Sequence, residues 1–494
     1  MPFSAANEKL MQKAAVSLPA LSARKRAIRD MADRWALRRE AFIAKSSFHQ
    51  EDENYLRFLI PAGLSILDVG SGTGHLLAAL NPERGVGIDM SARMIEVARA
   101  AHPQFNYVLG DAEHVETIKN IDGKFDIILL HDTIGSLEDC QSTLTNLRAL
   151  CHSDTRLVIA YYNYLWEPVL WLADKLNLRM PVPQTNWLKP ADIANLLSLA
   201  DYDVVRTDWR QLVPARLLGI GRFINRFVGT LPGIRKLCVR NYIVARPIGL
   251  PAEEQLTVTV VVPCRNERGN IESIIRRIPD FGGDLEILFI EGHSKDGTYE
   301  EIERLIPIYG HRDIKLVRQD GKGKGDAVYK AFDAARGDVL MILDADISVP
   351  PEDLPKFYNA LRSGKGEFIN GSRLVYPMED EAMRFLNRIA NHIFSMLFSW
   401  LLNQRFTDTL CGTKVLRKRH YQRIKQNRSY FGDFDPFGDF DLIFGAAKLN
   451  LKIQELPISY AARIYGETQI SRFSHGWLLL RMVIFAYFKL KVLA

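Results

Sequence analysis

Two aspartates separated by one residue, Asp344 and Asp346, follow an apolar run at residues 339–343. In an extended chain, side chains two residues apart point to the same side, so these two carboxylates can share one ligand. Carboxylate oxygens suit Mg²⁺ or Mn²⁺, and such an ion also binds phosphate oxygens. We therefore expect the pair to hold a metal ion that neutralises the charge developing on a departing diphosphate.

A glycine-rich turn, Gly70–Gly74, follows a short apolar run at Ser65–Val69 and predicts a second ligand site. Glycine lets the backbone lie against a ligand where a side chain would intrude. The spacing is GxGxG, which differs from the GxGxxG expected for dinucleotides. Asp89 ends the next apolar run, where a carboxylate can bind both ribose hydroxyls. Asp111 and the pair His131–Asp132 end two further runs, so four candidate strand ends line one crevice and indicate a nucleoside site.

The segments around both patterns follow the order strand, turn and helix, at Ile66–Leu80 and at Val258–Arg277. With 494 residues, the chain is too long for one ordinary core. We predict an α/β fold with two doubly wound domains, divided at the proline-containing segment Arg246–Leu256. The expected parts are a helical extension at 1–49, a first domain at 50–246, a linker at 247–256, a second domain at 257–470 and a basic amphipathic segment at 471–494.

The composition excludes several classes of protein. Hydrophobic residues make up 47% and charged residues 25%, which is typical of a soluble globular protein and not of a disordered or polytopic membrane protein. The net charge of +6 is too small to predict a nucleic-acid partner. The five cysteines form no CxxC pair, so we expect neither a disulfide framework nor structural zinc. Without an apolar signal segment at the N-terminus, a cytoplasmic location is expected.

Residues 50–246 resemble class I S-adenosylmethionine-dependent methyltransferases, through the glycine turn and the carboxylates at successive strand ends. The resemblance implies a Rossmann-like domain that binds the methionine part of the cofactor near the turn, then the ribose, then the adenine. The residues implied are Asp68, Gly70, Ser71, Gly72, Gly74, Asp89, Met90, Asp111 and Ala112. Methyl transfer depends mainly on alignment of the reactants, so we expect structural roles for His131 and Asp132. The methyl acceptor is not predicted.

Residues 256–475 resemble family 2 glycosyltransferases of the GT-A fold, especially dolichyl- or polyprenyl-phosphate sugar synthases. The motifs are PCRNE at 263–267, EGHSKDGT at 291–298, the DAD at 344–346 and TDTLCGTKVLRK at 407–418. The resemblance implies metal ligands Asp344 and Asp346 and catalytic residues Asp346 and Asp408. The implied nucleotide-sugar residues are Pro263, Arg265, Glu267, Glu291, Lys324, Asp344, Ala345, Asp346, Arg373 and Arg463.

The role of Asp408 depends on the acceptor. A sugar hydroxyl acceptor would need a carboxylate as general base, whereas a phosphate monoester is already an anionic nucleophile. In the second case, which we favour, Asp408 orients groups or assists the metal. The sequence departs from the family at Glu291–Gly292, where paired aspartates are usual, at Ser348, and at Gln469, which replaces a basic residue.

Two segments predict contact with lipid. Ser471–Ala494 combines aromatic and basic residues without an acid, and its apolar stretch is shorter than the roughly 20 residues of a spanning helix. A basic amphipathic helix in the membrane interface is therefore expected. Asn391–Phe406, just before the acceptor motif, is a second such segment. The alternative is that both helices pack over the edge of the sheet.

The sequence thus predicts a bifunctional transferase, peripheral on the inner face of a membrane. One half would transfer methyl groups from S-adenosylmethionine, and the other would use Mg²⁺ or Mn²⁺ and a GDP- or UDP-linked sugar to glycosylate a polyprenyl phosphate. Two alternatives remain open: a surface glycan is the sugar acceptor, or one half is a non-catalytic scaffold.

Overall fold

The structure is a computed structural model that describes residues 21–176, 185–215, 219–250, 255–375, 385–431, 440–460, 465 and 472–492. The chain divides into two compact units, Met1–Leu250 and Pro251–Ala494. Each unit is built on a mixed sheet of seven strands. The predicted pair of α/β domains is confirmed.

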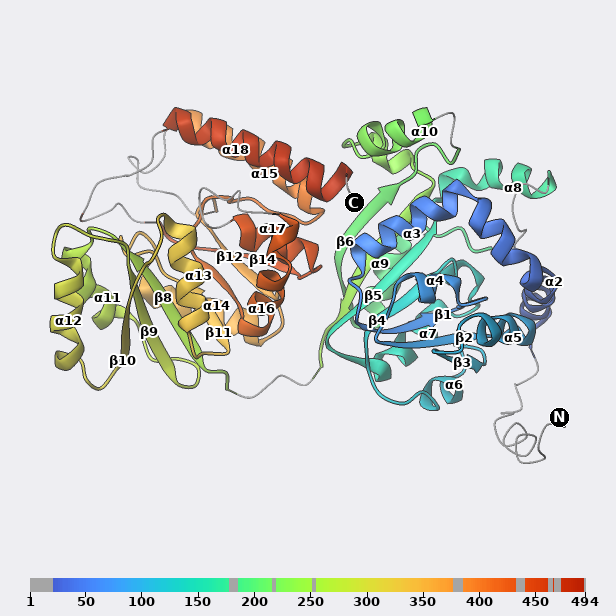
Figure 1. Cartoon of the computed structure of the whole chain (residues 1–494), viewed down its shortest axis with the longest axis horizontal. Coiled ribbons are helices and arrows are strands. Elements are labelled where there is room, and N and C mark those ends of the chain that lie inside the picture. Colours follow the sequence, from blue (N-terminus) through green and yellow to red (C-terminus); the bar gives the residue numbers. More distant parts are fainter. Residues whose placement is uncertain are drawn as a thin grey trace. The chain divides into compact units, whose positions relative to one another are not determined.

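The sheet of the first unit has the strand order β3-β2-β1-β4-β5-β7-β6 (Figure 1). Its strands are β1 (Ser65–Val69), β2 (Arg84–Asp89), β3 (Asn106–Leu109), β4 (Phe125–His131), β5 (Cys151–Tyr162), β6 (Tyr202–Arg210) and β7 (Arg240–Pro247). β7 is antiparallel to β5 and β6, and the other neighbouring pairs are parallel. The order changes direction between β1 and β4, and such a switch point opens a crevice at the carboxyl ends of the strands.

The described helices of the first unit include two that precede the sheet. The helices are α2 (Ala23–Lys45), α3 (Ser47–Leu59), α4 (His75–Ala79), α5 (Ala92–Ala101), α6 (Val115–Lys119), α7 (Cys140–Leu147), α8 (Glu167–Lys175), α9 (Pro190–Leu199) and α10 (Ile220–Phe223). Ser22 and Ser46 cap α2 and α3 by accepting hydrogen bonds from backbone amides of Lys25 and His49. α3 runs through the expected boundary at residue 50.

A buried charge network ties α3 to the sheet. Arg240 of β7 is fully buried and pairs with Asp52 of α3 through an Nη2–Oδ2 distance of 2.9 Å. Asp52 also accepts hydrogen bonds from Tyr242 and His131, and Arg240 pairs with Asp132. Burial opposes ionisation of Asp52, but Arg240 and His131 hold its pKa below the ordinary value. The network therefore fixes α3 beside the carboxyl end of β4.

The sheet of the second unit has the order β10-β9-β8-β11-β13-β12-β14 (Figure 1). Its strands are β8 (Val258–Cys264), β9 (Leu285–Glu291), β10 (Asp313–Arg318), β11 (Val339–Ile342), β12 (Phe368–Ser372), β13 (Lys414–Arg417) and β14 (Ile453–Pro457). Only β13 among these strands is antiparallel to its neighbours. The switch point lies between β8 and β11, so the ends of these two strands open the crevice.

Helices of the second unit pack against this sheet and bury its apolar residues. The described helices of this unit include α11 (Ile271–Arg277), α12 (Thr298–Ile308), α13 (Lys324–Ala334), α14 (Leu354–Arg362), α15 (Phe385–Leu402), α16 (Lys418–Gln426), α17 (Phe440–Lys448) and α18 (Arg472–Tyr487). Valines and isoleucines of β8 and β9 pack with α11, α12 and α14 in one core. Among the described residues, no helix combines the length and apolarity that a bilayer crossing needs.

Replacing Arg240 by methionine tests the buried network. The substitution leaves Asp52 buried without its main counter-charge, so we expect the free energy of unfolding of the first unit to fall by about 3–5 kcal/mol. Urea denaturation followed by circular dichroism measures the change. The control is Arg93→Met, which removes an exposed pair with Glu96 and should cost less than about 1 kcal/mol. Equal losses in the two variants would contradict this account of the network.

Candidate functional site

The glycine turn after β1 adopts a backbone conformation that suits glycine. Gly70, Gly72 and Gly74 have φ values of +80°, +53° and +75°. A Cβ on Gly70 would lie 2.3 Å from Oγ1 of Thr133, and one on Gly74 would lie 2.2 Å from the hydroxyl of Tyr107. The protein's own side chains, rather than a ligand alone, therefore require glycine at positions 70 and 74.

Two adjoining cavities lie at the carboxyl ends of β1 to β4. The larger, of about 210 Å³, is lined by the predicted residues Gly70, Asp89, Met90, Asp111 and Ala112. The smaller shares Gly70 with it and adds the predicted Asp68 and Ser71. Of the nine residues predicted to bind the cofactor, Gly72 and Gly74 lie in the turn without lining either cavity. The sheet thus brings the predicted strand ends together.

The carboxylates of this site differ in their partners. Asp89 accepts hydrogen bonds from the backbone amides of Gly72 and Ser91, each at 2.8 Å. Asp111 is paired with Lys25 of α2. Asp68 is 2% exposed, and among the described residues its Oδ1 has no hydrogen-bond partner. Burial, together with the nearby charge of Asp89, raises the pKa of Asp68 to about 7. An unpartnered buried carboxylate fits a cationic ligand group.

Helix α2 covers the larger cavity. The sequence analysis did not predict this position for the helix. Trp35, Arg39 and Phe42 of this helix line the cavity, as does His49 of α3. Its volume is below the roughly 300–1,000 Å³ typical of ligand pockets. Trp35 and Phe42 are two helical turns apart and therefore share a face, which is the signal in the sequence that could have identified a lining helix.

His131 and Asp132, at the end of β4, are engaged within the protein. Burial opposes protonation of His131, but the charges of Asp132 and Asp52 raise its pKa above the ordinary value. Asp132 is paired with Arg240. A histidine hydrogen-bonded to Asp52 and an aspartate paired with Arg240 are poor bases, so this geometry favours the structural roles expected for both residues.

In the second unit, the ends of β8 and β9 carry the predicted nucleoside residues. Pro263 lies in β8, and Cys264 pairs in register with Glu291 of β9. Glu291 is buried and accepts a hydrogen bond from the amide of Ser294. Glu267, also buried, accepts one from Nδ2 of Asn270 at 2.7 Å, whereas Arg265 is exposed. The two glutamates lie at the same edge of the sheet.

Asp344 and Asp346 follow β11 in a turn rather than in extended chain. The amide of Ile347 donates to the carbonyl of Asp344 at 3.3 Å, and Ile347 has a φ of +55°. The extended conformation expected for these two residues is therefore wrong, because β11 ends at Ile342 and the turn sets the direction of both carboxylates. Ala345, between them, is buried.

Each of these two aspartates has close neighbours. Nζ of Lys324, the first residue of α13, lies 2.8 Å from Oδ1 of Asp344. Burial opposes ionisation of Asp344, but Lys324 holds its pKa below the ordinary value. Oδ1 of Asp346 accepts hydrogen bonds from the amide and hydroxyl of Ser348. A Cβ on Gly412 would lie 1.9 Å from Oδ2 of Asp344. Asp344 is thus held between an ammonium group and backbone.

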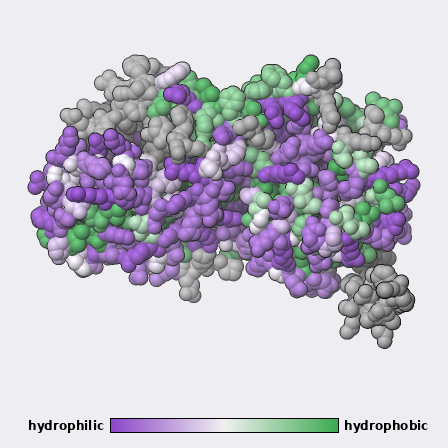
Figure 2. All heavy atoms as spheres, in the orientation of Figure 1, coloured by the Kyte–Doolittle hydropathy of each residue, from purple (hydrophilic) through white to green (hydrophobic). Residues whose placement is uncertain are grey.

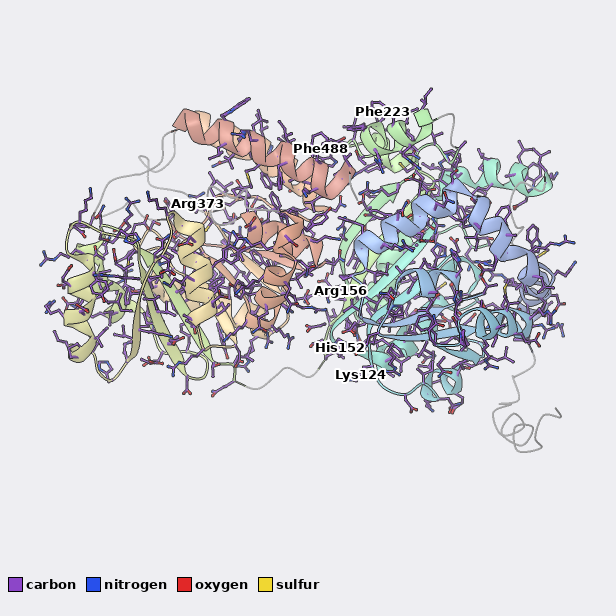
Figure 3. The ribbon with its side chains drawn as sticks, in the orientation of Figure 1. Lys124, His152, Arg156, Phe223, Arg373 and Phe488 are labelled. Atoms are coloured by element: carbon purple, nitrogen blue, oxygen red, sulfur yellow. The ribbon has the colours of Figure 1, made fainter. Side chains whose placement is uncertain are left out.

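Arg373, which Figure 3 labels, follows the end of β12 and is paired with Asp408. Its Nε and Nη2 donate to Oδ2 and Oδ1 of Asp408, each at 2.7 Å, and its backbone amide also donates to Oδ2. Burial opposes ionisation of Asp408, but Arg373 keeps its pKa low. A carboxylate held in this bidentate pair is a weak proton acceptor. Arg463, also predicted to meet phosphate, lies outside the described residues, as does Gln469.

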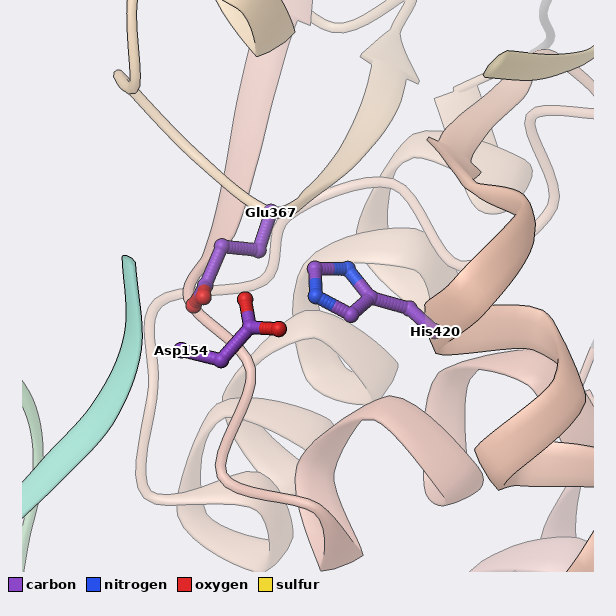
Figure 4. A group of neighbouring side chains, drawn as sticks. All are labelled: Asp154, Glu367 and His420. Atoms are coloured by element: carbon purple, nitrogen blue, oxygen red, sulfur yellow. The ribbon is translucent and has the colours of Figure 1, made fainter. Parts of the chain in front are cut away.

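Figure 4 draws a second set of side chains of metal-binding type. Within the second unit, Glu367 and His420 have ligand atoms within 4.8 Å of each other. Oε2 of Glu367 also accepts a hydrogen bond from the amide of Lys452. Protein zinc sites use three or four side chains, so this pair does not make a metal site. Asp154, which the figure also labels, belongs to the first unit and is no part of this pair. Within either unit, no three His, Cys, Asp or Glu residues suited to a metal come together in the described part of the chain.

The two units match different families. Residues 259–427 match the family described as Glycosyl transferase family 2, and residues 60–192 match one described as Methyltransferase domain. A dolichol-phosphate mannosyltransferase of Pyrococcus furiosus is 29% identical over 44% of this chain and 59% of its own length. A low-salt glycan biosynthesis hexosyltransferase of Haloferax volcanii is 28% identical over 46% of this chain and 53% of its own length.

The chain therefore spans little more than half the length of either relative. A solved SAM-dependent methyltransferase of Thermotoga maritima matches 44% of this chain and 99% of its own length, at 16% identity and a TM-score of 0.34. The two resemblances predicted from the motifs are confirmed by the family matches: the chain carries a methyltransferase domain in its first unit and a glycosyltransferase family 2 domain in its second.

Proposed function

We propose that the second unit transfers a sugar from a nucleotide sugar to a polyprenyl phosphate with Mg²⁺ or Mn²⁺, and that the first unit methylates an acceptor with S-adenosylmethionine. The observation that carries the first proposal is the group of Asp344, Asp346 and Lys324 at the switch point between β8 and β11. The dolichol-phosphate mannosyltransferase of Pyrococcus furiosus, as a relative, supports a dolichol-phosphate type of acceptor.

The donor set at this switch point fits a divalent cation. Two carboxylates separated by one residue provide hard oxygen ligands, and Asp344 already lies against a cationic ammonium. A bound ion would neutralise charge on the departing nucleoside diphosphate. We assign Asp344 and Asp346 to this ion. Lys324 would then move its contact from Asp344 to the diphosphate of the donor.

Arg373 and Asp408 serve the acceptor side in this proposal. The attacking oxygen of a phosphate monoester is already anionic, so its new bond to C1 forms while the bond from C1 to the diphosphate breaks, without a general base. Asp408 orients the guanidinium of Arg373, and this guanidinium binds the phosphate group of the acceptor. The bidentate pair argues against Asp408 as the base that a glycan hydroxyl would need.

Helices α15 and α18 support a lipid acceptor and a peripheral location at the inner face of a membrane. They contact each other, for example through Trp400 and Tyr487, whose ring centroids are 5.5 Å apart. Both bury apolar residues in the second unit, yet Met396, Trp477 and Ile484 stay exposed. α15 ends at Leu402, shortly before Asp408, so an exposed apolar surface leads toward the acceptor motif. The two helices can therefore pack over the edge of the sheet with one face and present an apolar surface to lipid with the other.

The first unit offers a matching set of groups for S-adenosylmethionine. We assign the methionine part to Asp68 and the glycine turn, the ribose to Asp89 with Met90, and the adenine to Asp111 with Ala112. The unpartnered Oδ1 of Asp68 would accept the cofactor's ammonium group. The cofactor supplies an activated methyl group, and the residues of the cavity align it with the acceptor. Lys25 must release or share Asp111 when the adenine binds.

A transfer assay tests the glycosyltransferase proposal. Full-length protein is incubated with Mn²⁺, short-chain polyprenyl phosphate and labelled GDP- or UDP-sugars, and then extracted with organic solvent. We expect label in the organic phase with the parent protein, and loss of this label with Asp346→Asn. The control is Asp280→Asn, which changes an exposed acid outside the proposed metal site and should keep the label. With an oligosaccharide supplied as a second acceptor, label confined to that aqueous glycan would instead favour the glycan acceptor suggested by the Haloferax relative.

Substituting Gly412 by alanine tests the position of Asp344. The added Cβ would lie 1.9 Å from Oδ2, so the carboxylate must move. Because misplacement by about 1 Å can cost roughly 100-fold in rate, we expect a loss of transfer of about that size. Gly310→Ala is the matched control, since no atom lies closer than 3.5 Å to its new Cβ. Full activity of Gly412→Ala would show that Asp344 need not stay where it is.

Cofactor affinity should depend on the protonation of Asp68. With its pKa raised to about 7, this carboxyl is largely neutral at pH 6 and ionised at pH 8. The cofactor's ammonium group favours the ionised form, so affinity should rise with pH over this range, by up to about tenfold. Calorimetric titration of the protein with S-adenosylmethionine at each pH measures this affinity. Asp68→Asn should bind weakly and without this pH dependence, and the same pH profile in both proteins would refute the assignment.

A further inference from the structure

The first unit exposes large apolar side chains on two segments that do not contribute to the cofactor cavity. One segment is α8, and the other is the connection between β6 and β7 that contains α10. Six of these residues are more than half exposed, and we call them the apolar edge: Val169, Trp171, Leu172, Ile220, Phe223 and Leu237. Figure 2 shows hydrophobic atoms gathered over α8 and α10, and Figure 3 labels Phe223.

Hydrogen bonds join the start of α8 to the end of the β6–β7 connection. Nε1 of Trp166, just before α8, donates a hydrogen bond to the carbonyl of Leu237 at 2.8 Å. Nδ2 of Asn163 donates to the carbonyls of Lys236 and Cys238, also at 2.8 Å. These bonds hold the start of α8 against the end of the β6–β7 connection. The apolar edge is therefore a fixed feature of the first unit.

Packing within the first unit does not account for this surface. A helix on a globular protein normally turns its apolar stripe toward the core. Of the residues of α8, only Leu170 is buried, while Val169, Trp171 and Leu172 on either side of it are exposed. Large apolar side chains exposed in numbers on neighbouring segments mark a site of interaction.

The charges around the edge select the partner. Residues 209–252 contain no aspartate or glutamate. Within the connection, Arg222, Arg226 and Lys236 are exposed. Arg222 is paired with Glu51, and α8 carries Glu167 and Asp174 as well as Lys175, so the cationic excess belongs to the connection. Nζ of Lys175 lies 3.7 Å from the centre of the Trp171 ring, a tryptophan–cation pair suited to a membrane interface.

We propose that the apolar edge docks the methyltransferase unit on an anionic bilayer surface, with its apolar side chains among the acyl chains and Arg226 and Lys236 against lipid phosphates. Exposed apolar residues bordered by cations are what an interfacial element presents to such a surface. The partner is thus a lipid bilayer, not a second protein. This docking does not depend on the lipid acceptor proposed for the second unit.

Vesicle flotation of the full-length protein tests the proposal. Vesicles of phosphatidylcholine with phosphatidylglycerol should carry the protein upward, and those of phosphatidylcholine alone should carry much less. Arg226→Gln with Lys236→Gln should weaken binding about 30-fold, because each cation near an anionic surface contributes roughly fivefold. Ile220→Ser with Phe223→Ser should weaken it further. All four residues are exposed, so the variants should keep the parent's circular dichroism and melting temperature.

Two control variants separate the first unit's edge from other surfaces. Leu199→Ser with Lys124→Gln makes the same kinds of change at exposed positions elsewhere in the first unit and should bind as the parent does (Figure 3). Ile484→Ser with Phe488→Ser changes the apolar surface of the second unit. The proposal is overturned if the parent does not float, or if the edge variants float like the parent. It is also overturned if they change the oligomeric state instead, which would mean that protein covers the edge.

Discussion

Each sheet reverses the direction in which strands are added, between β1 and β4 in the first unit and between β8 and β11 in the second. At such a point the loops after two adjacent parallel strands diverge, and the space between them is left open. The glycine turn and Asp132 flank one opening, and Glu267 and Asp344 follow the two strands at the other. The chemistry assigned to the chain depends on this one topological constraint, which occurs twice.

Buried charges then determine what each opening can bind. In the first unit, Arg240 satisfies Asp52 and Asp132, whereas Oδ1 of the buried Asp68 has no hydrogen-bond partner among the described residues. In the second unit, Arg373 satisfies Asp408, while Asp344 faces an ammonium group that a metal-bound diphosphate could engage. Because burying an unpaired charge is costly, a ligand must compensate Asp68, and it must take over the lysine contacts of Asp344 and Asp111.

Local sequence pattern was sufficient for the strands and the residues at their ends. The run Ser65–Val69 is β1 itself, and the apolar runs before Asp89, Glu291 and Asp344 are all strands, because buried parallel strands need continuous apolar sequence. Other features could not be predicted in this way. The pair of Asp52 and Arg240 joins residues 188 positions apart, and the lining of the cavity by α2 depends on how that helix packs. The turn at Asp344 depends on a positive φ at Ile347, which a β-branched residue rarely adopts.

In the proposed glycosyltransferase site, Asp344 and Asp346 bind a divalent cation together with a nucleoside diphosphate. Electron paramagnetic resonance of Mn²⁺ titrated into the full-length protein, with GDP or UDP present, tests it most directly, because bound and free Mn²⁺ give different signals. We predict saturable binding that Asp346→Asn removes. Binding of the same affinity and stoichiometry in that variant would contradict the account.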